Sequence, residues 1–151
     1  MNDQVPEETL VASNGRAELT LDQLAILHEG LGRFMLAASD RMRRCLHAAK
    51  AKNSRLARFQ LSEAMKSLRL SELVRPQYTE AIEKFIEHDL VALDELLERD
   101  EWSEFDAMWE AMTNAVNDNH AEFNHGYLVW RVSQIPPEEL VLEPQEQAPT
   151  P

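Results

Sequence analysis

The sequence predicts an all-α protein, an antiparallel four-helix bundle with an extended arm at each end. Apolar residues recur at helical spacing in four stretches, and short breaks with turn residues separate these stretches. The 151 residues include only 4 glycines and few β-branched runs, which disfavours a sheet. We expect an N-terminal arm over residues 1–19, the bundle domain over 20–133 and a proline-rich C-terminal arm over 134–151.

Local signals bound the first two helices. The first begins at Thr20 and ends in the turn KAKNSRL, where Asn53 can cap the second helix. The second should end before Pro76, because the residue before a proline disfavours helical backbone. The first stripe comprises Leu24, Leu27, Leu31, Phe34, Ala38, Met42, Cys45 and Ala49, and the second Leu56, Phe59, Leu61, Met65 and Leu68.

The third and fourth helices are bounded in the same way. Pro76 can open the third helix, and Asp100 or Ser103 can cap the fourth. Gly126 should end the fourth helix, and YLVWRV then reads as extended. The third stripe comprises Ile82, Phe85, Ile86, Leu90, Leu93, Leu96 and Leu97, and the fourth Phe105, Met108, Trp109, Met112, Val116, Asn119, His120 and Phe123.

Charge is segregated along the chain. The net charge of −12 makes nucleic acid a poor partner. Residues 41–69 are nevertheless almost entirely basic among their charged positions, and residues 80–110 are strongly acidic. These regions either face each other as neighbouring helices, or the basic strip docks an acidic partner.

The expected location is the cytoplasm. The first twenty residues lack the basic and apolar regions of a signal peptide, and no apolar run is long enough to span a membrane. Cys45 is the only cysteine, so no internal disulfide can form, and its place on an apolar stripe indicates packing.

Two histidines near the C-terminus are the candidates for chemistry. His120 lies on the inward stripe, whereas His125 is five residues further on and points elsewhere, which makes a poor two-ligand metal site. Glu122 and His125 form one Glu-x-x-His motif, but a di-iron bundle needs two. His120 is therefore either a hydrogen-bonded core histidine or a single axial ligand or interface residue. No nucleophile, P-loop or dinucleotide motif accompanies it.

Aromatic residues cluster in the same region. Trp109 lies on the fourth helix, and Tyr127 and Trp130 lie on the extended segment after it. They either close the end of the bundle, or Tyr127 and Trp130 anchor an interface. The pocket or interface candidates are Trp109, His120, His125, Tyr127, Trp130 and Arg131.

The stretch VNDNH-AEFN-HGYLVWR, residues 116–131, resembles a bacterial family of four-helix bundles akin to cytochrome c′. In that family the last helix ends in Cys-Asn-x-Cys-His, followed after four residues by His-x-Phe-Ile-Val-x-Arg. The segment AKNSRLARFQLSEAMKSL also resembles the second helix of the family. The matching positions are Asn117, His120, His125, Val129 and Arg131.

Two departures from the family change the expected chemistry. Val116 and Asn119 stand where the family has the cysteines that bond to haem, so covalent haem attachment is impossible. The resemblance therefore implies a scaffold that has lost its cofactor. Loose haem binding through His120 remains an alternative.

The overall profile also resembles the small α subunit of two-subunit hydroquinone 1,2-dioxygenases. That resemblance implies a non-catalytic chain without a cofactor, in a hetero-oligomer with a larger cupin subunit that carries non-haem Fe(II). Trp109, Tyr127 or Trp130 would then close one side of the ring-cleaving pocket. The alternatives are a haem- or small-ligand-binding module and a scaffold or regulatory protein.

Overall fold

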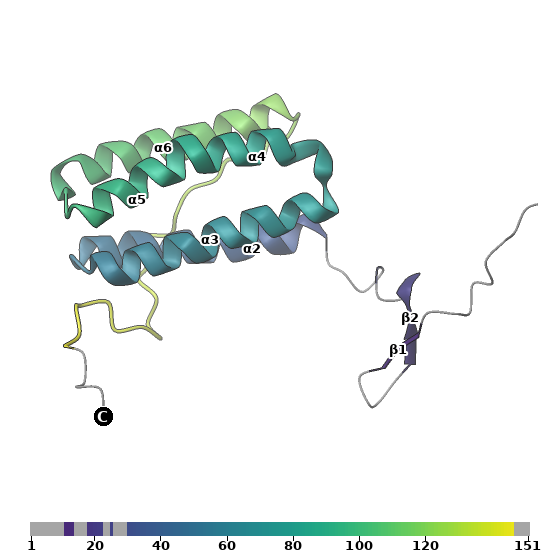
Figure 1. Ribbon diagram of the computed structural model, residues 1–151. Coiled ribbons are helices and arrows are strands. Elements are labelled where there is room, and N and C mark those ends of the chain that lie inside the picture. The colour runs from purple at the N-terminus through teal and green to yellow at the C-terminus, as the bar shows by residue number, and fades with distance from the viewer. Residues whose placement is uncertain (1–10, 14–17, 23–24, 26–29, 147–151) are drawn as a thin grey trace, which may run out of the picture. The chain divides into compact units, whose positions relative to one another are not determined.

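The computed structural model describes residues 11–13, 18–22, 25 and 30–146 (Figure 1). The chain divides into two compact units, Met1–Gly30 and Leu31–Pro151. In the first unit, β1 (Val11–Ser13) pairs with β2 (Glu18–Thr20) in an antiparallel register. The predicted N-terminal arm therefore contains a short β ribbon.

The predicted first helix is interrupted at Gly30. Thr20 ends β2, and Gly30 has a φ of 70°, a left-handed conformation that interrupts a right-handed helix. The long helix α2 begins only at the next residue, as Leu31–Lys50. Leu21, Asp22 and Ala25 are helical, while the predicted stripe residues Leu24 and Leu27 lie outside the described residues.

All the regular elements described in the second unit are helices. Helix α2 lies beside α3 (Ser54–Val74), and the remaining helices lie over this pair (Figure 1). The third predicted helix is present in four pieces, because a 3₁₀ turn opens it and a π turn interrupts it. The pieces and the last helix are η1 (Pro76–Tyr78), α4 (Thr79–Phe85), η2 (Ile86–Leu90), α5 (Val91–Glu98) and α6 (Trp102–Glu122).

The signals at the ends of α3 are confirmed. Asn53 Oδ1 accepts a hydrogen bond from Leu56 N at 3.1 Å, which caps α3. Helix α3 ends at Val74, two residues before Pro76, and Pro76 opens η1. The turn between α2 and α3 also contacts the start of α6, where Lys52 Nζ lies 4.6 Å from the centre of the Trp102 ring.

Both predicted boundaries of α6 differ from the structure. Glu101 precedes the helix and makes no side-chain cap bond, whereas Asp100 adopts a φ of 54° in the turn before it. At the other end, Asn124 takes the left-handed conformation, with a φ of 62°, that Gly126 was expected to supply. Asparagine tolerates this conformation better than most residues, so it replaces glycine here.

The predicted stripes supply most of the core, but the last stripe residues of α6, Asn119, His120 and Phe123, are not buried. Cys45 is fully buried, and burial raises the pKa of its thiol, which keeps the thiol protonated and confirms a packing role. Phe59 is an exception, because 54% of it is exposed on the outer side of α3. The fully buried large residues include Leu61, Ile86, Leu90, Leu93, Leu97 and Met112.

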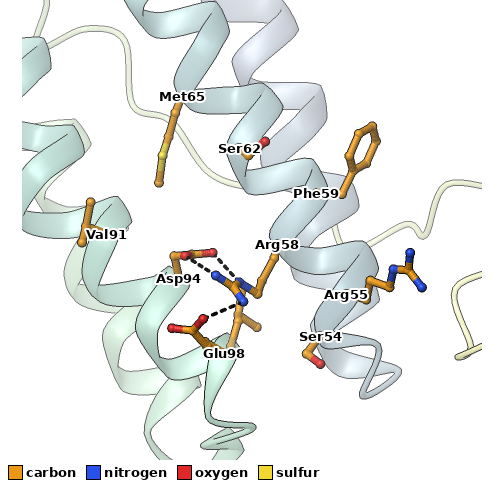
Figure 2. Close-up of a pocket in the computed structure, with 10 residues that line it drawn as sticks. Ser54, Arg55, Arg58, Phe59, Ser62, Met65, Val91, Asp94 and Glu98 are labelled. Atoms are coloured by element: carbon orange, nitrogen blue, oxygen red, sulfur yellow. Dashed lines mark hydrogen bonds and ion pairs between the residues drawn. The ribbon is translucent and has the colours of Figure 1, made fainter.

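Some of the segregated charges form ion pairs with each other within the chain. Arg58 of α3 forms a bidentate pair with Asp94 of α5, with both N–O distances 2.9 Å (Figure 2). Arg69 Nε lies 3.1 Å from Glu83 Oε1 of α4. The basic helix α3 therefore faces acidic helices of the same chain. This was the first of the two interpretations of the charge pattern.

Glu72 and Glu83 form a carboxyl pair between α3 and α4. Burial, together with the hydrogen bond to Glu83, raises the pKa of Glu72 above the ordinary value of 4.5. Arg69 lowers the pKa of Glu83, so the shared proton resides on Glu72. Among the described residues, Glu72 Oε1 is a buried oxygen without a hydrogen-bond partner.

We expect the Glu72→Gln variant to lose less stability than the wild type as the pH rises. The folded chain retains the Glu72 proton where the unfolded chain has lost it, so the contribution of Glu72 to stability falls as the pH rises above 4.5. Glutamine keeps a hydrogen-bond donor and does not titrate. Melting temperatures measured between pH 4.5 and neutral pH should diverge in favour of the variant, whereas exposed Glu95→Gln should follow the wild type. Parallel curves for Glu72→Gln and the wild type would contradict this account.

Candidate functional site

The segment after α6 is fastened back onto that helix by Asn117. Asn117 Oδ1 accepts a hydrogen bond from Trp130 N at 2.7 Å, and Asn117 Nδ2 donates to Trp130 O at 3.1 Å. An asparagine amide carries the same donor and acceptor as a backbone peptide group. Asn117 therefore pairs with Trp130 as a neighbouring strand would.

His120 fastens the same segment one turn further along α6. Its Nδ1 lies 2.9 Å from Leu128 O, and because a carbonyl only accepts, Nδ1 is the donor of this hydrogen bond. The backbone of His120 also accepts a hydrogen bond from His125 N at 2.6 Å. His120 thus acts as a clamp between helix and loop. It is hydrogen-bonded, as one interpretation held, but it is not among the buried residues of α6.

Trp130 anchors the segment from the inside. Its Nε1 donates to Ser39 Oγ at 2.9 Å, and its ring packs against the core. Two residues later, Val132 is buried with 8% exposure. Trp130 is therefore a partly buried anchor between the loop and the core.

We call residues 124–131 the anchored loop, because these contacts hold it at both ends. Three consecutive apolar side chains of the loop face solvent: Tyr127 is 82% exposed, Leu128 48% and Val129 73%. His125 supports Tyr127, since His125 Nδ1 lies 3.2 Å from the Tyr127 hydroxyl and the rings meet edge to face. The loop presents a fixed apolar surface.

The six candidate residues do not form one pocket. Trp109 is buried beside Phe105, with ring centres 5.7 Å apart, and lies about 16 Å along α6 from His120. Arg131 is exposed, and His125 is half-buried. Only His120, His125 and Tyr127 meet, around the turn that begins the anchored loop.

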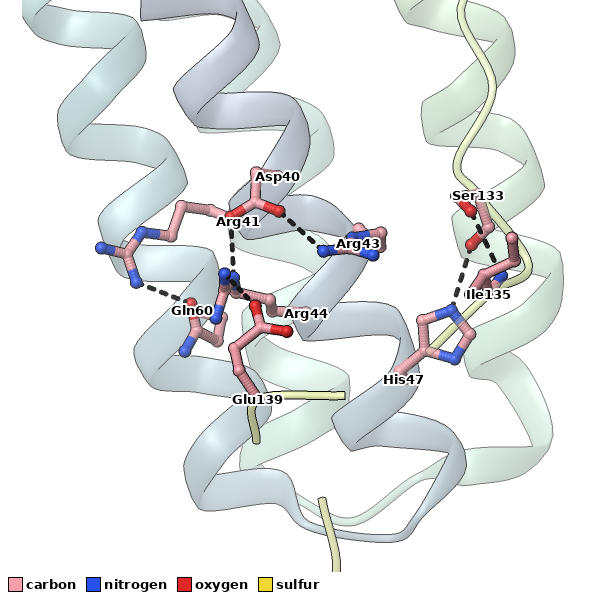
Figure 3. A network of polar contacts seen from close by, with 9 residues as sticks. All are labelled: Asp40, Arg41, Arg43, Arg44, His47, Gln60, Ser133, Ile135 and Glu139. Carbon is pink, nitrogen blue, oxygen red and sulfur yellow. Dashed lines mark hydrogen bonds and ion pairs between the residues drawn. The ribbon is translucent and has the colours of Figure 1, made fainter. Parts of the chain in front are cut away.

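The C-terminal tail, residues 133–142, lies along α2 (Figure 3). His47 Nε2 donates to Ser133 O at 3.0 Å, and Asn53 Nδ2 donates to Leu142 O at 3.0 Å. Arg44 forms an ion pair with Glu139, and Lys50 Nζ donates to Gln134 Oε1. The predicted C-terminal arm therefore binds to the surface of its own chain.

Sequence reasoning missed these tail-binding side chains. Their positions, 44, 47, 50 and 53, follow one another at intervals of three residues, so a row of donors runs from α2 into the cap of α3. That spacing was visible in the sequence, but its acceptors lie some 85 residues away and follow no periodic pattern. The row binds the tail through polar contacts.

We expect removal of residues 133–151 to lower the free energy of unfolding by about 1–2 kcal/mol, mainly because buried His47 loses its acceptor. The exposed tail contacts add little. Urea unfolding measures the change, and a chain ending at Glu146 is the control because it keeps every tail contact named above. An unchanged midpoint for the longer truncation would show that the tail does not stabilise the chain.

The described residues offer little for catalysis. They contain no group of three or more His, Cys, Asp or Glu side chains that could hold a metal ion. A hollow of about 530 Å³ lies between α3 and α5, and Met65 and Val91 face each other across it (Figure 2). Of its charged residues, Arg58, Asp94 and Glu98 bind one another, and Arg55 is the fourth. The anchored loop is therefore the better candidate for a functional surface.

No protein-family profile matches the chain, and neither a curated protein nor a solved structure is detectably similar to it. Of the helices in the described part of the chain, none combines the length and the apolar character needed to cross a membrane.

Proposed function

We propose that the chain is a non-catalytic binding subunit that docks onto a larger protein through the anchored loop. The observation that carries this proposal is the exposure of Tyr127, Leu128 and Val129 on a segment that α6 and Ser39 hold in place. Adjacent exposed apolar side chains are typical of binding surfaces. Because the loop is already ordered, binding costs less conformational entropy than ordering a free segment would.

In this proposal the helical unit is an antiparallel four-helix bundle whose role is to position the loop. Asn117 and His120 lie in the last two turns of α6, so the helix end sets the place of the loop. Trp130 and Val132 tie the other end to the core. Residues that resemble a haem-binding helix end are thus used as structural clamps.

We propose a cupin-type subunit with non-haem Fe(II) as the partner, in a cytoplasmic hetero-oligomer that cleaves aromatic rings as hydroquinone 1,2-dioxygenases do. The resemblance of the sequence to the small subunit of those enzymes supports this choice. The chain itself would hold no cofactor, and Tyr127 would reach the partner surface first because it is the most exposed residue of the loop.

Purification of the tagged full chain from its native host tests this proposal. Mass spectrometry should identify one larger cupin protein in stoichiometric amount, and iron but no haem should accompany the complex. A stoichiometric partner that is not an enzyme would overturn the dioxygenase assignment. A lone chain that carries haem would overturn the binding-subunit proposal and would make His120 Nε2 a ligand.

A further inference from the structure

The anchored loop continues into an extended stretch with alternating sides. Trp130 and Val132 point toward the core, whereas Val129, Arg131 and Ser133 are exposed. An inward and outward alternation with a period of two residues is typical of an extended strand. The side chain of Asn117 occupies one edge of this stretch, where it binds both backbone groups of Trp130.

The other edge of the stretch binds no backbone or side-chain group of the described residues. In an extended chain, the N–H and C=O groups of successive residues point to opposite edges, so those of Val129 and Arg131 point away from Asn117. Within the part of the chain that the structure describes, these backbone groups of Val129 and Arg131 have no hydrogen-bond partner. Both residues are exposed, so this edge is open to another chain.

We propose that Val129 to Arg131 form a free strand edge onto which an extended segment of the larger partner adds by backbone hydrogen bonding. This inference rests on the proposed function and specifies how the partner is held. Strand addition supplies affinity through the main chain and specificity through the alternate side chains. The complementary segment carries an apolar residue against Val129 and Tyr127, and an acidic residue opposite Arg131.

Arg131 also has a role in the isolated chain, where its charge opposes pairing of this edge with a second copy. An unpaired strand edge invites association between identical chains, and a charged side chain on the edge opposes it. Two copies of this edge would bring two arginines together, whereas a partner segment with an acidic residue would neutralise the charge. The chemistry of the edge therefore favours a different chain over a second copy.

Arg131→Pro and Arg131→Ala separate backbone pairing from side-chain contact. Both remove the charge, but only proline removes the N–H, and proline is tolerated at strand edges. We expect Arg131→Pro to bind the larger subunit at least about tenfold more weakly than Arg131→Ala, with similar melting temperatures. Equal affinities of the two variants, with wild-type binding intact, would overturn strand addition and leave the proposed function standing.

Hydrogen exchange of the wild-type complex gives an independent result should the proline variant fail to fold. The Val129 and Arg131 amides should exchange rapidly in the isolated full chain and at least about 100-fold more slowly with the larger subunit bound. The Trp130 amide should be slow in both states. Fast exchange of Val129 and Arg131 in the complex would overturn the inference. A dimer of the isolated chain that Arg131→Pro abolishes would assign the edge to a second copy instead, and absence of any complex would overturn the proposed function with it.

Discussion

Replacing Tyr127 and Val129 together by serine should weaken binding of the larger subunit by a factor on the order of 100 or more, because exposed apolar anchors carry most of the affinity of an interface. Both side chains face solvent in the isolated chain, at 82% and 73% exposure. Their removal should therefore leave the free energy of unfolding unchanged. Titration of the larger subunit with wild type and variant measures the affinity, and urea unfolding measures the stability.

A matched control for this double variant is Leu36→Ser. Leu36 lies on α2 and is 74% exposed. Its substitution therefore removes a similarly exposed apolar side chain at a site outside the anchored loop. We expect Leu36→Ser to bind as the wild type does. Equal weakening by Leu36→Ser, or no weakening by the double variant, would show that the loop does not make the interface.

Asn117→Ala should lower both stability and binding, because the substitution releases the loop from α6. The two hydrogen bonds to Trp130 are lost together, and we expect a cost of about 2 kcal/mol in the free energy of unfolding. The Trp130 amide should then exchange faster than the rest of the core. Binding of the larger subunit should weaken as well, since a mobile loop must be ordered on binding.

The control for Asn117→Ala is Asn114→Ala, which removes an exposed asparagine one turn earlier on the same helix. Both substitutions raise helix propensity similarly, so the difference between them reports the contacts with Trp130. If Asn117→Ala proves as stable as Asn114→Ala and binds as well, the clamp described above does not hold the loop.

The core helices were predictable because their signals are local. Asn53 as a cap and Pro76 as a stop act through residues only a few positions away, and buried leucines repeat with the period of the helix. Phe59 was misplaced because α3 carries apolar residues on more than one side. The pairing of Thr20 with Val11 in the β ribbon was missed, because a strand of three residues leaves no alternating pattern in the sequence.

The candidate segment could be found from the sequence, but its roles could not. The unusual cluster around His120 pointed to residues 116–132, and an extended stretch was expected after the helix. That Asn117 binds the backbone of Trp130, thirteen residues later, depends on how the chain turns at Asn124. The same holds for Trp130, whose partner Ser39 lies 91 residues away.

The most direct test of the anchored loop as the binding surface is photo-crosslinking in the native host, with a benzophenone amino acid in place of Tyr127 or, as a control, Leu36. Both positions are exposed, so the probe should not disturb the fold at either site. The account predicts one crosslinked species between position 127 and the larger cupin subunit, and none from position 36. Failure to crosslink at position 127 while position 36 captures the larger subunit would contradict it.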